Sequence, residues 1–124
     1  MDAKKLNELY VKNGLTKDDV FEHKFYKIIS RAGIDKIQAN NNIVIEYDLL
    51  HNAPDNSCII IKASATCGDK KIQTFGESTP KNTSNAYPVA MAEKRAMSRA
   101  VLKLTGFYEL GHFGEDEADD FNRK

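Results

Sequence analysis

CIIIKASATCGDKKIQTFGEST, residues 58–79, is the stretch that decides the fold. Two runs rich in β-branched residues, 58–67 and 71–76, flank the pair Gly68-Asp69, which is typical of a tight hairpin turn. Polar side chains alternate along both runs, which predicts a sheet with one wet face. The residues expected on that face are Ser64, Thr66, Lys71, Gln73 and Glu77.

A further strand and a long helix flank this hairpin. Residues 43–50 are rich in β-branched and aromatic side chains and predict a strand before it. After it, Pro88 suits the first turn of a helix, which is expected to run to about Thr105 and end at Gly106. Small and apolar side chains form a stripe that buries against a sheet. The stripe comprises Val89, Ala92, Ala96, Met97, Ala100, Val101 and Leu104.

The predicted fold class is therefore α+β, an antiparallel sheet of three or more strands with one long helix packed across it. An N-terminal helical segment is expected over residues 2–13, ended by Gly14, and a turn or short helix from Thr16 to Gly33. We expect one domain over residues 1–114 and an acidic tail over residues 115–124.

Charge is distributed unevenly along a chain of zero net charge. Residues 68–103 hold seven Lys or Arg against three acids, whereas residues 109–120 hold six acids and no base. Three interpretations of the acidic tail are open: solvated disorder, folding back over the basic region, or docking of a host or phage partner protein.

The basic residues of the long helix predict an anion-binding surface. Arg95, Arg99 and Lys103 are spaced four apart and would form a line about 12 Å long on one helix face, flanked by Lys94. A row of cations suits the phosphates of single-stranded nucleic acid, although a solvated helix face is the plainer explanation.

Further basic and aromatic residues are candidates for the same surface. Lys62 and Lys71 of the hairpin and Lys81 of the connection are expected to add charge, and Tyr87 to stack on a base. Phe75 is a second stacking candidate, but core packing is the favoured interpretation for it.

Sequence motifs of enzymes, metal sites and membrane proteins are not found in the chain. His23, His51 and His112 lie in no metal-ligand spacing, and no phosphate-binding loop or nucleophile elbow is present, so we expect no enzyme, metal or cofactor. Cys58 and Cys67 are expected to be thiols rather than a disulfide. Without a signal peptide or an apolar run of membrane length, the chain is expected to be cytoplasmic.

The stretch FGESTPKNTSNAYPVAMAEKRAMSRAVLKLTGF, residues 75–107, followed by EDEADDF, resembles phage and prophage recombination proteins. The layout over residues 34–106 is similar to the β-β-β-α core of the single-strand annealing superfamily, which includes the Rad fifty-two, Erf and Sak types. The resemblance implies ATP-independent binding and annealing of single-stranded DNA by a homo-oligomeric ring or filament, in a bacterial host. It places Arg99 and Lys103 in a DNA groove, although the spacing from Lys103 to the closing glycine is one residue longer here.

Two other functions stay open. One alternative is a protein-interaction module, such as a phage inhibitor of a host protein, that binds no nucleic acid. A nuclease is the least favoured alternative, because the carboxylates cluster in the tail rather than in the predicted core.

Overall fold

A computed structural model describes residues 3–22, 26–53, 58–80 and 87–117. The elements are α1 (Ala3–Lys12), η1 (Lys17–Asp19), β1 (Val20–Glu22), β2 (Lys27–Ile29), α2 (Arg31–Asn40), β3 (Val44–Asn52), β4 (Ile59–Cys67), β5 (Lys70–Ser78), α3 (Pro88–Thr105), η2 (Tyr108–Leu110), β6 (His112–Gly114) and η3 (Glu115–Glu117).

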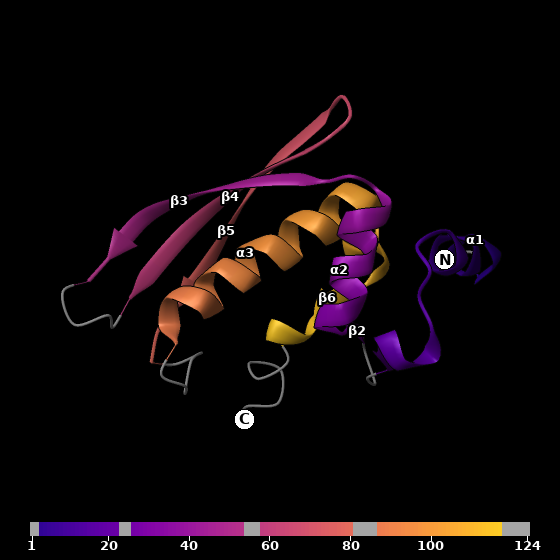
Figure 1. Cartoon of the computed structure of the whole chain (residues 1–124). Helices are drawn as coiled ribbons and strands as arrows, with labels where there is room; N and C mark the ends of the chain where they lie inside the picture. The colour runs from indigo at the N-terminus through magenta and orange to yellow at the C-terminus, as the bar shows by residue number, and fades with distance from the viewer. Residues whose placement is uncertain (1–2, 23–25, 54–57, 81–86, 118–124) are drawn as a thin grey trace.

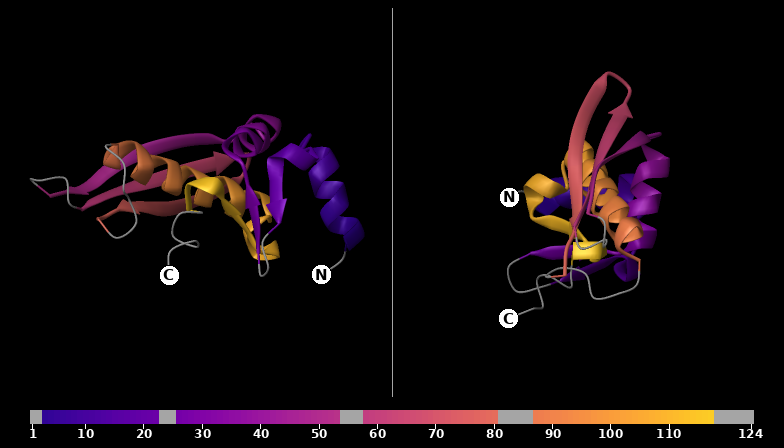
Figure 2. Two further views of the ribbon diagram at one scale, coloured as in Figure 1. Left: turned by 90° about the horizontal axis from the view of Figure 1, so that it is seen from below. Right: turned by 90° about the vertical axis from the view of Figure 1, so that its left-hand side faces the viewer.

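The main sheet has the strand order β3-β4-β5, and both pairs of strands are antiparallel. The long helix α3 lies across one face, against β5 and β4 (Figure 1). This arrangement confirms the α+β fold class. The turn at Gly68 has a φ of +59°, a left-handed conformation that favours glycine, and the β4–β5 hairpin projects from the molecule there (Figure 2).

The two faces of the sheet differ as the alternation of side chains predicts. On β4, Ile59, Ile61, Ala63 and Ala65 are buried beneath α3, while the residues between them point to the opposite face. No helix covers that opposite face within the described residues, and we call it the open face.

Small residues bring α3 close to the sheet. Ala92, Ala96 and Ala100 are fully buried, and the Thr74 hydroxyl donates to the Ala96 carbonyl at 2.6 Å. A Cβ atom at Gly76 would collide with the backbone of Ala92 and Ala96. The helix therefore requires glycine at this point of β5, and the predicted small-residue stripe is confirmed at its centre.

The expected turn or short helix from Thr16 to Gly33 holds only for η1, because the rest of this segment contains the strands β1 and β2. Gly33 does not end a helix but lies in the first turn of α2, which Ser30 caps by accepting from the Gly33 amide at 3.0 Å. A side chain at Gly33 would press on Ile29 and Asp19, so the glycine serves close packing rather than termination. The strands β1, β2 and β6 form a second sheet, in which β2 and β6 are parallel.

The predicted N-terminal helix is confirmed as α1, which lies at one end of the molecule (Figures 1 and 2). Tyr10 of α1 stacks on Phe107, with ring centroids 6.1 Å apart, and its hydroxyl lies 2.8 Å from Nε2 of the buried His112. These contacts join the first helix to the segment that follows α3.

Two simpler findings complete the fold. Cys58 and Cys67 are free thiols. Of the helices within the described ranges, none combines the length and apolar character that crossing a membrane requires.

Candidate nucleic-acid interface

The expected line of exposed cations along α3 is not what the structure contains. Arg95 is fully buried, and its guanidinium donates to the backbone carbonyls of Glu77 at 3.0 Å and Asp116 at 3.3 Å. The interval of four residues that aligns the basic side chains also aligns them with the outer edge of β5. The expectation that Arg95 forms part of an exposed site is therefore wrong.

Arg99 is held by two carboxylates. Its guanidinium lies 2.7 Å from Glu77 and 3.0 Å from Glu117, and also donates to the Phe75 carbonyl. Burial opposes the charge on Arg99, but the bonds to both carboxylates outweigh it and raise its pKa. Burial likewise opposes the charge on Glu77, and the Arg99 guanidinium reverses that effect and lowers the pKa of Glu77. Only 20 % of the Arg99 side chain is exposed, so the expected open row of cations is wrong here too.

The start of the acidic tail supplies these partners. Asp116 is buried and lies 2.8 Å from the Arg31 guanidinium and 3.4 Å from the Ser98 hydroxyl. Folding back of the tail over the basic region is therefore confirmed for Glu115–Glu117, which form η3 against α3 and contact Arg31 of α2. The expected boundary between domain and tail, after residue 114, coincides with the start of η3, so the first three tail residues pack against the domain. Residues 118–124 lie outside the described residues.

The other predicted residues on or near α3 do not form one surface. Lys94 is half-buried. Lys103 is exposed, with its ammonium 4.9 Å from the centre of the Tyr108 ring. Tyr87 precedes α3 and is 70 % exposed. Lys81 lies outside the described residues.

Lys103 lies in a groove between the C-terminal ends of α1 and α3 and the β4–β5 hairpin. The groove has a volume of about 480 Å³, and Lys12 and Lys70 line it together with Lys103 and one acid, Glu109. It lies apart from the rest of the predicted site, because Lys62 and Lys71 point to the open face.

The open face places an exposed aromatic ring beside a lysine. Phe75 on β5 is 49 % exposed and stands directly opposite Lys62 on β4. The next pair towards the hairpin turn is Gln73 with Ser64, and the pair after that is Lys71 with Thr66. The core-packing interpretation of Phe75 is wrong, because its position on the strand turns it away from α3.

Acidic residues mark the other half of this face. Glu46 and Asp48 on β3 stand opposite Ser64 and Lys62, and the Asp48 carboxylate lies 3.9 Å from the Lys62 ammonium. This ion pair is exposed enough to be weak, so it leaves Lys62 available to a stronger anion. Glu77 of β5 has the parity of this face too, but its carboxylate is held by Arg99. Apart from it, the open face is basic and aromatic along β4 and β5, and acidic along β3.

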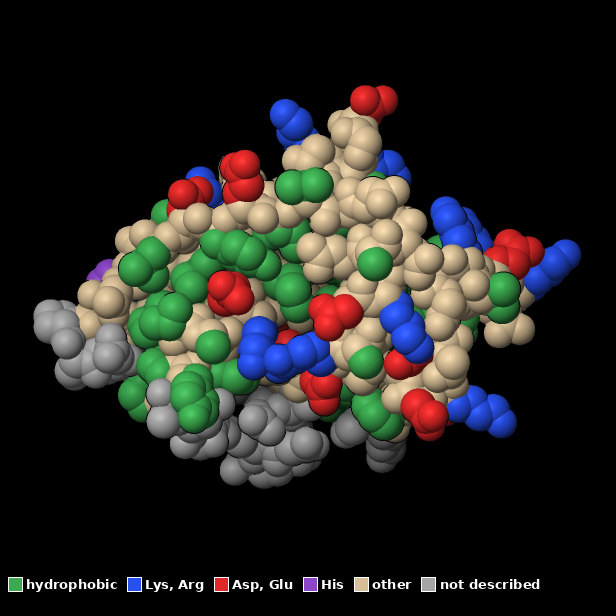
Figure 3. Space-filling model, in the orientation of Figure 1, with side chains coloured by type: hydrophobic (Ala, Val, Ile, Leu, Met, Phe, Trp, Pro, Cys, Tyr) green, Lys and Arg blue, Asp and Glu red, His purple; other side chains and the backbone are tan. Residues whose placement is uncertain are grey.

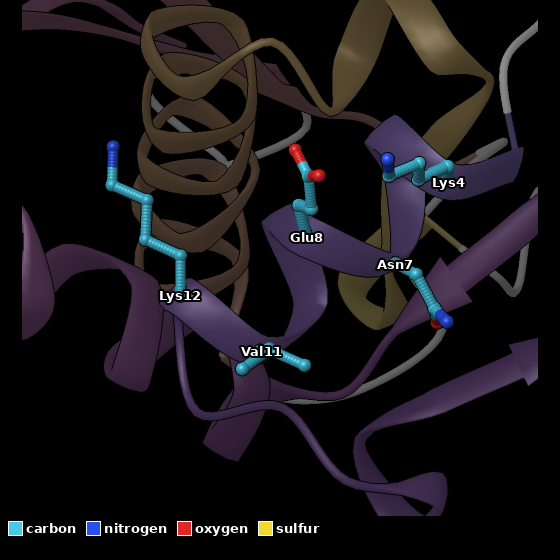
Figure 4. A pocket seen from close by; sticks show the side chains of 5 residues that line it. All are labelled: Lys4, Asn7, Glu8, Val11 and Lys12. Carbon is cyan, nitrogen blue, oxygen red and sulfur yellow. The ribbon is translucent and has the colours of Figure 1, made fainter.

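The hollow along α1 is a weaker candidate for a ligand site. A hollow of about 660 Å³ is lined by Lys4, Asn7, Glu8, Val11 and Lys12, all from α1, and Figure 4 shows their side chains pointing in several directions along one helix. A surface formed by a single helix does not enclose a ligand.

His112 is also not a candidate catalytic or metal-binding residue. Its burial and the charge of Lys27 lower its pKa, so the imidazole is neutral inside the aromatic cluster with Tyr10 and Phe107. Within the described ranges, no three His, Cys, Asp or Glu side chains come together as metal ligands would.

Comparison of the chain with protein-family models, curated proteins and solved structures finds no match. The resemblance to the annealing superfamily therefore stays a prediction, and the candidate interface rests on its own residues.

Proposed function

We propose that the chain binds single-stranded DNA on the open face of the main sheet. The observation that supports this most directly is the exposed ring of Phe75 standing directly opposite Lys62. An aromatic ring that projects from a sheet offers a stacking surface for a base, and neighbouring cations attract the backbone phosphates.

The spacing of the strands supports the same function. Neighbouring strands lie about 4.8 Å apart and residues on one face of a strand recur about every 6.8 Å, so Phe75, Lys62 and Lys71 span roughly two nucleotides. Gln73 and Ser64 lie between them, with their side chains 3.5 Å apart, and offer polar groups to the sugar and phosphate. Stacking on an aromatic ring does not distinguish one base from another, so this surface suits binding without sequence preference.

Annealing, assembly into a ring or filament, and a place in phage recombination are further parts of the proposal, and they rest on the resemblance alone. Binding that leaves the Watson–Crick edges of stacked bases free is compatible with pairing to a second strand. Arg95 and Arg99 have a different role in this proposal: they fasten β5, which carries Phe75 and Lys71, to α3.

The test is fluorescence anisotropy with a labelled single-stranded oligonucleotide and its duplex at two salt concentrations. We expect salt-sensitive binding that prefers the single strand. Phe75→Ala should weaken it by about 1–3 kcal/mol, the range for loss of one base stack. Lys62→Ala combined with Lys71→Ala should weaken binding and flatten its salt dependence.

The charge-matched control for the double lysine variant is Lys5→Ala with Lys17→Ala, which removes two exposed lysines of α1 and η1 and should leave binding unchanged. Binding that ignores the Phe75 and lysine variants would remove the open face as the site. Absence of binding to either oligonucleotide would favour the second candidate, a protein-interaction module, for which the exposed β3 strand is the supporting observation.

A further inference from the structure

The edge strand β3 exposes more apolar side chain than any other described element. Val44, Tyr47, Leu49 and Leu50 are each at least 39 % exposed. Figure 3 shows hydrophobic side chains gathered over the part of the molecule where β3 runs beside the N-terminal half of α3. Nothing in the proposed DNA interface uses these residues.

The backbone of β3 offers an open row of hydrogen-bonding groups. The Ala53 amide donates to the Cys58 carbonyl at 2.9 Å, which fixes the even-numbered residues of β4 as those that turn towards β3. Tyr47 and Leu49 stand opposite the odd-numbered Ala63 and Ile61, so their backbone groups turn outward. Among the described residues, no turn, loop or cap hydrogen bond reaches this edge.

The two faces of β3 differ in chemistry. Tyr47 and Leu49 lie on the α3 side, where burial and the nearby charge of Glu93 on α3 raise the pKa of Tyr47 to about 12. Glu46 and Asp48 lie on the open face, where they are the acidic half. A strand added beside β3 would therefore meet the side chains of Tyr47 and Leu49, with Glu93 of α3 near Tyr47, on one face and the carboxylates of Glu46 and Asp48 on the other.

We infer that β3 binds an extended peptide strand of a partner protein, in which apolar and Lys or Arg side chains alternate. Such a strand would pair with the outward backbone groups of Tyr47 and Leu49, pack its apolar side chains beside them, and place its cations next to Glu46 and Asp48. This is addition of a strand to a sheet edge. It uses none of the residues proposed to bind DNA, and the two surfaces meet where Asp48 contacts Lys62.

A second copy of the chain fits this edge less well. A two-fold antiparallel pairing of β3 with itself, centred on Tyr47, would set Glu46 of each copy against Asp48 of the other. Like charges directly opposite each other destabilise a pair of strands. Charge complementarity therefore favours a basic partner strand over self-association.

The probe for this inference is a fluorescein-labelled peptide as long as β3, nine residues, in which lysine and valine alternate. Its control has the same composition with the lysines and valines in two blocks. We expect the alternating peptide to bind more tightly than the blocked peptide in an anisotropy titration. Equal binding would reduce the effect to general ionic attraction and overturn the inference.

Two sets of variants locate the contact. Tyr47→Pro removes an outward N–H and should weaken binding at least about tenfold. Glu46→Lys with Asp48→Lys leaves the backbone intact and should also weaken it about tenfold at low salt. The charge-matched control, Glu8→Lys with Asp69→Lys, changes exposed residues away from β3 and should bind as the wild type does.

Circular dichroism and light scattering complete the test. If Tyr47→Pro fails to fold, the double charge reversal still decides the outcome. Unchanged binding by the charge-reversed protein would overturn the inference. A dimer in the unaltered protein that the charge reversal abolishes or strengthens would instead identify a second copy as the occupant.

Discussion

The two edges of the main sheet differ in how far they are covered: arginine side chains and η3 cover the β5 edge, whereas the β3 edge is exposed. At the β5 edge, Arg95 and Arg99 donate to the outward carbonyls of Glu77 and Phe75. The segment η3 packs against α3 beside them. At the β3 edge, nearly every residue is exposed, and four of them are large and apolar.

This difference explains why the helix carries arginines in its buried half. An edge strand presents unpaired backbone groups that invite pairing with another chain, and proteins block such edges in several ways. Here guanidinium groups, which each carry five N–H donors, occupy the carbonyls of one edge and bind carboxylates at the same time. The other edge is left available to a partner strand.

The largest expected effect comes from breaking the blocked edge at Arg95. Arg95→Met keeps the length of the side chain but leaves the carbonyls of Glu77 and Asp116 without this buried donor. Each buried acceptor that loses its partner costs about 1–3 kcal/mol, so the free energy of unfolding should fall by about 3 kcal/mol. Urea denaturation followed by circular dichroism measures this change.

Lys94→Met is the matched control, because it makes the same replacement of a long cation at the neighbouring position of α3. Lys94 is half-buried, and we expect a change within about 0.5 kcal/mol. Similar losses in the two variants would show that Arg95 acts through general packing of the helix rather than through the β5 edge.

A smaller effect is expected from acid. Because the pKa of Glu77 is lower in the folded protein than its ordinary value of 4.5, its contact with Arg99 stabilises the protein above that pH. The contribution is lost as the pH falls through the folded-state pKa. Since 42 % of the Glu77 side chain is exposed, solvent screening keeps the contribution to about 1 kcal/mol or less.

Glu77→Gln should therefore lower stability at neutral pH and make little difference at a pH well below 4.5. Unfolding free energies measured by urea titration across this interval give the comparison. Glu93→Gln, on the exposed side of α3, is the control and should leave the curve parallel to that of the wild type. A constant loss from Glu77→Gln at every pH would contradict the assigned ion pair.

The sequence predicts the sheet and α3 well but not the role of the arginines. Alternating polarity and the Gly68-Asp69 pair identify β4 and β5, and the alanine stripe identifies the buried face of α3. The burial of Arg95 depends on where the β5 edge and η3 lie, which are tertiary contacts between segments about 20 residues apart. Helical spacing alone therefore could not separate a buried arginine from an exposed one.

Phe75 and Gly33 show two further limits of prediction from the sequence. Strict alternation predicts Lys71, Gln73 and Glu77 on the wet face, and Phe75 shares their parity. Alternation therefore predicts the observed exposure of Phe75, whereas its aromatic character favours the core. In α2, the glycine at position 33 predicts the end of a helix, because glycine commonly ends helices. Close packing against Ile29 is the physical reason for it here, and no local pattern reports such a contact.

The smallest effect is expected at the open edge, where Leu49 and Ile61 form a matched pair in one row of the sheet. Leu49 is 57 % exposed and Ile61 only 5 %, although both point to the α3 side. Leu49→Thr keeps a residue that suits strands and should change the free energy of unfolding by no more than about 0.5 kcal/mol. Ile61→Thr puts a hydroxyl into the core and should cost about 2 kcal/mol or more. Comparing the two free energies of unfolding, measured by urea denaturation, tests whether the apolar side chains of β3 are dispensable for folding.

A large loss from Leu49→Thr would mean that the edge side chain supports the fold itself, and its exposure would then have to be explained without a partner strand.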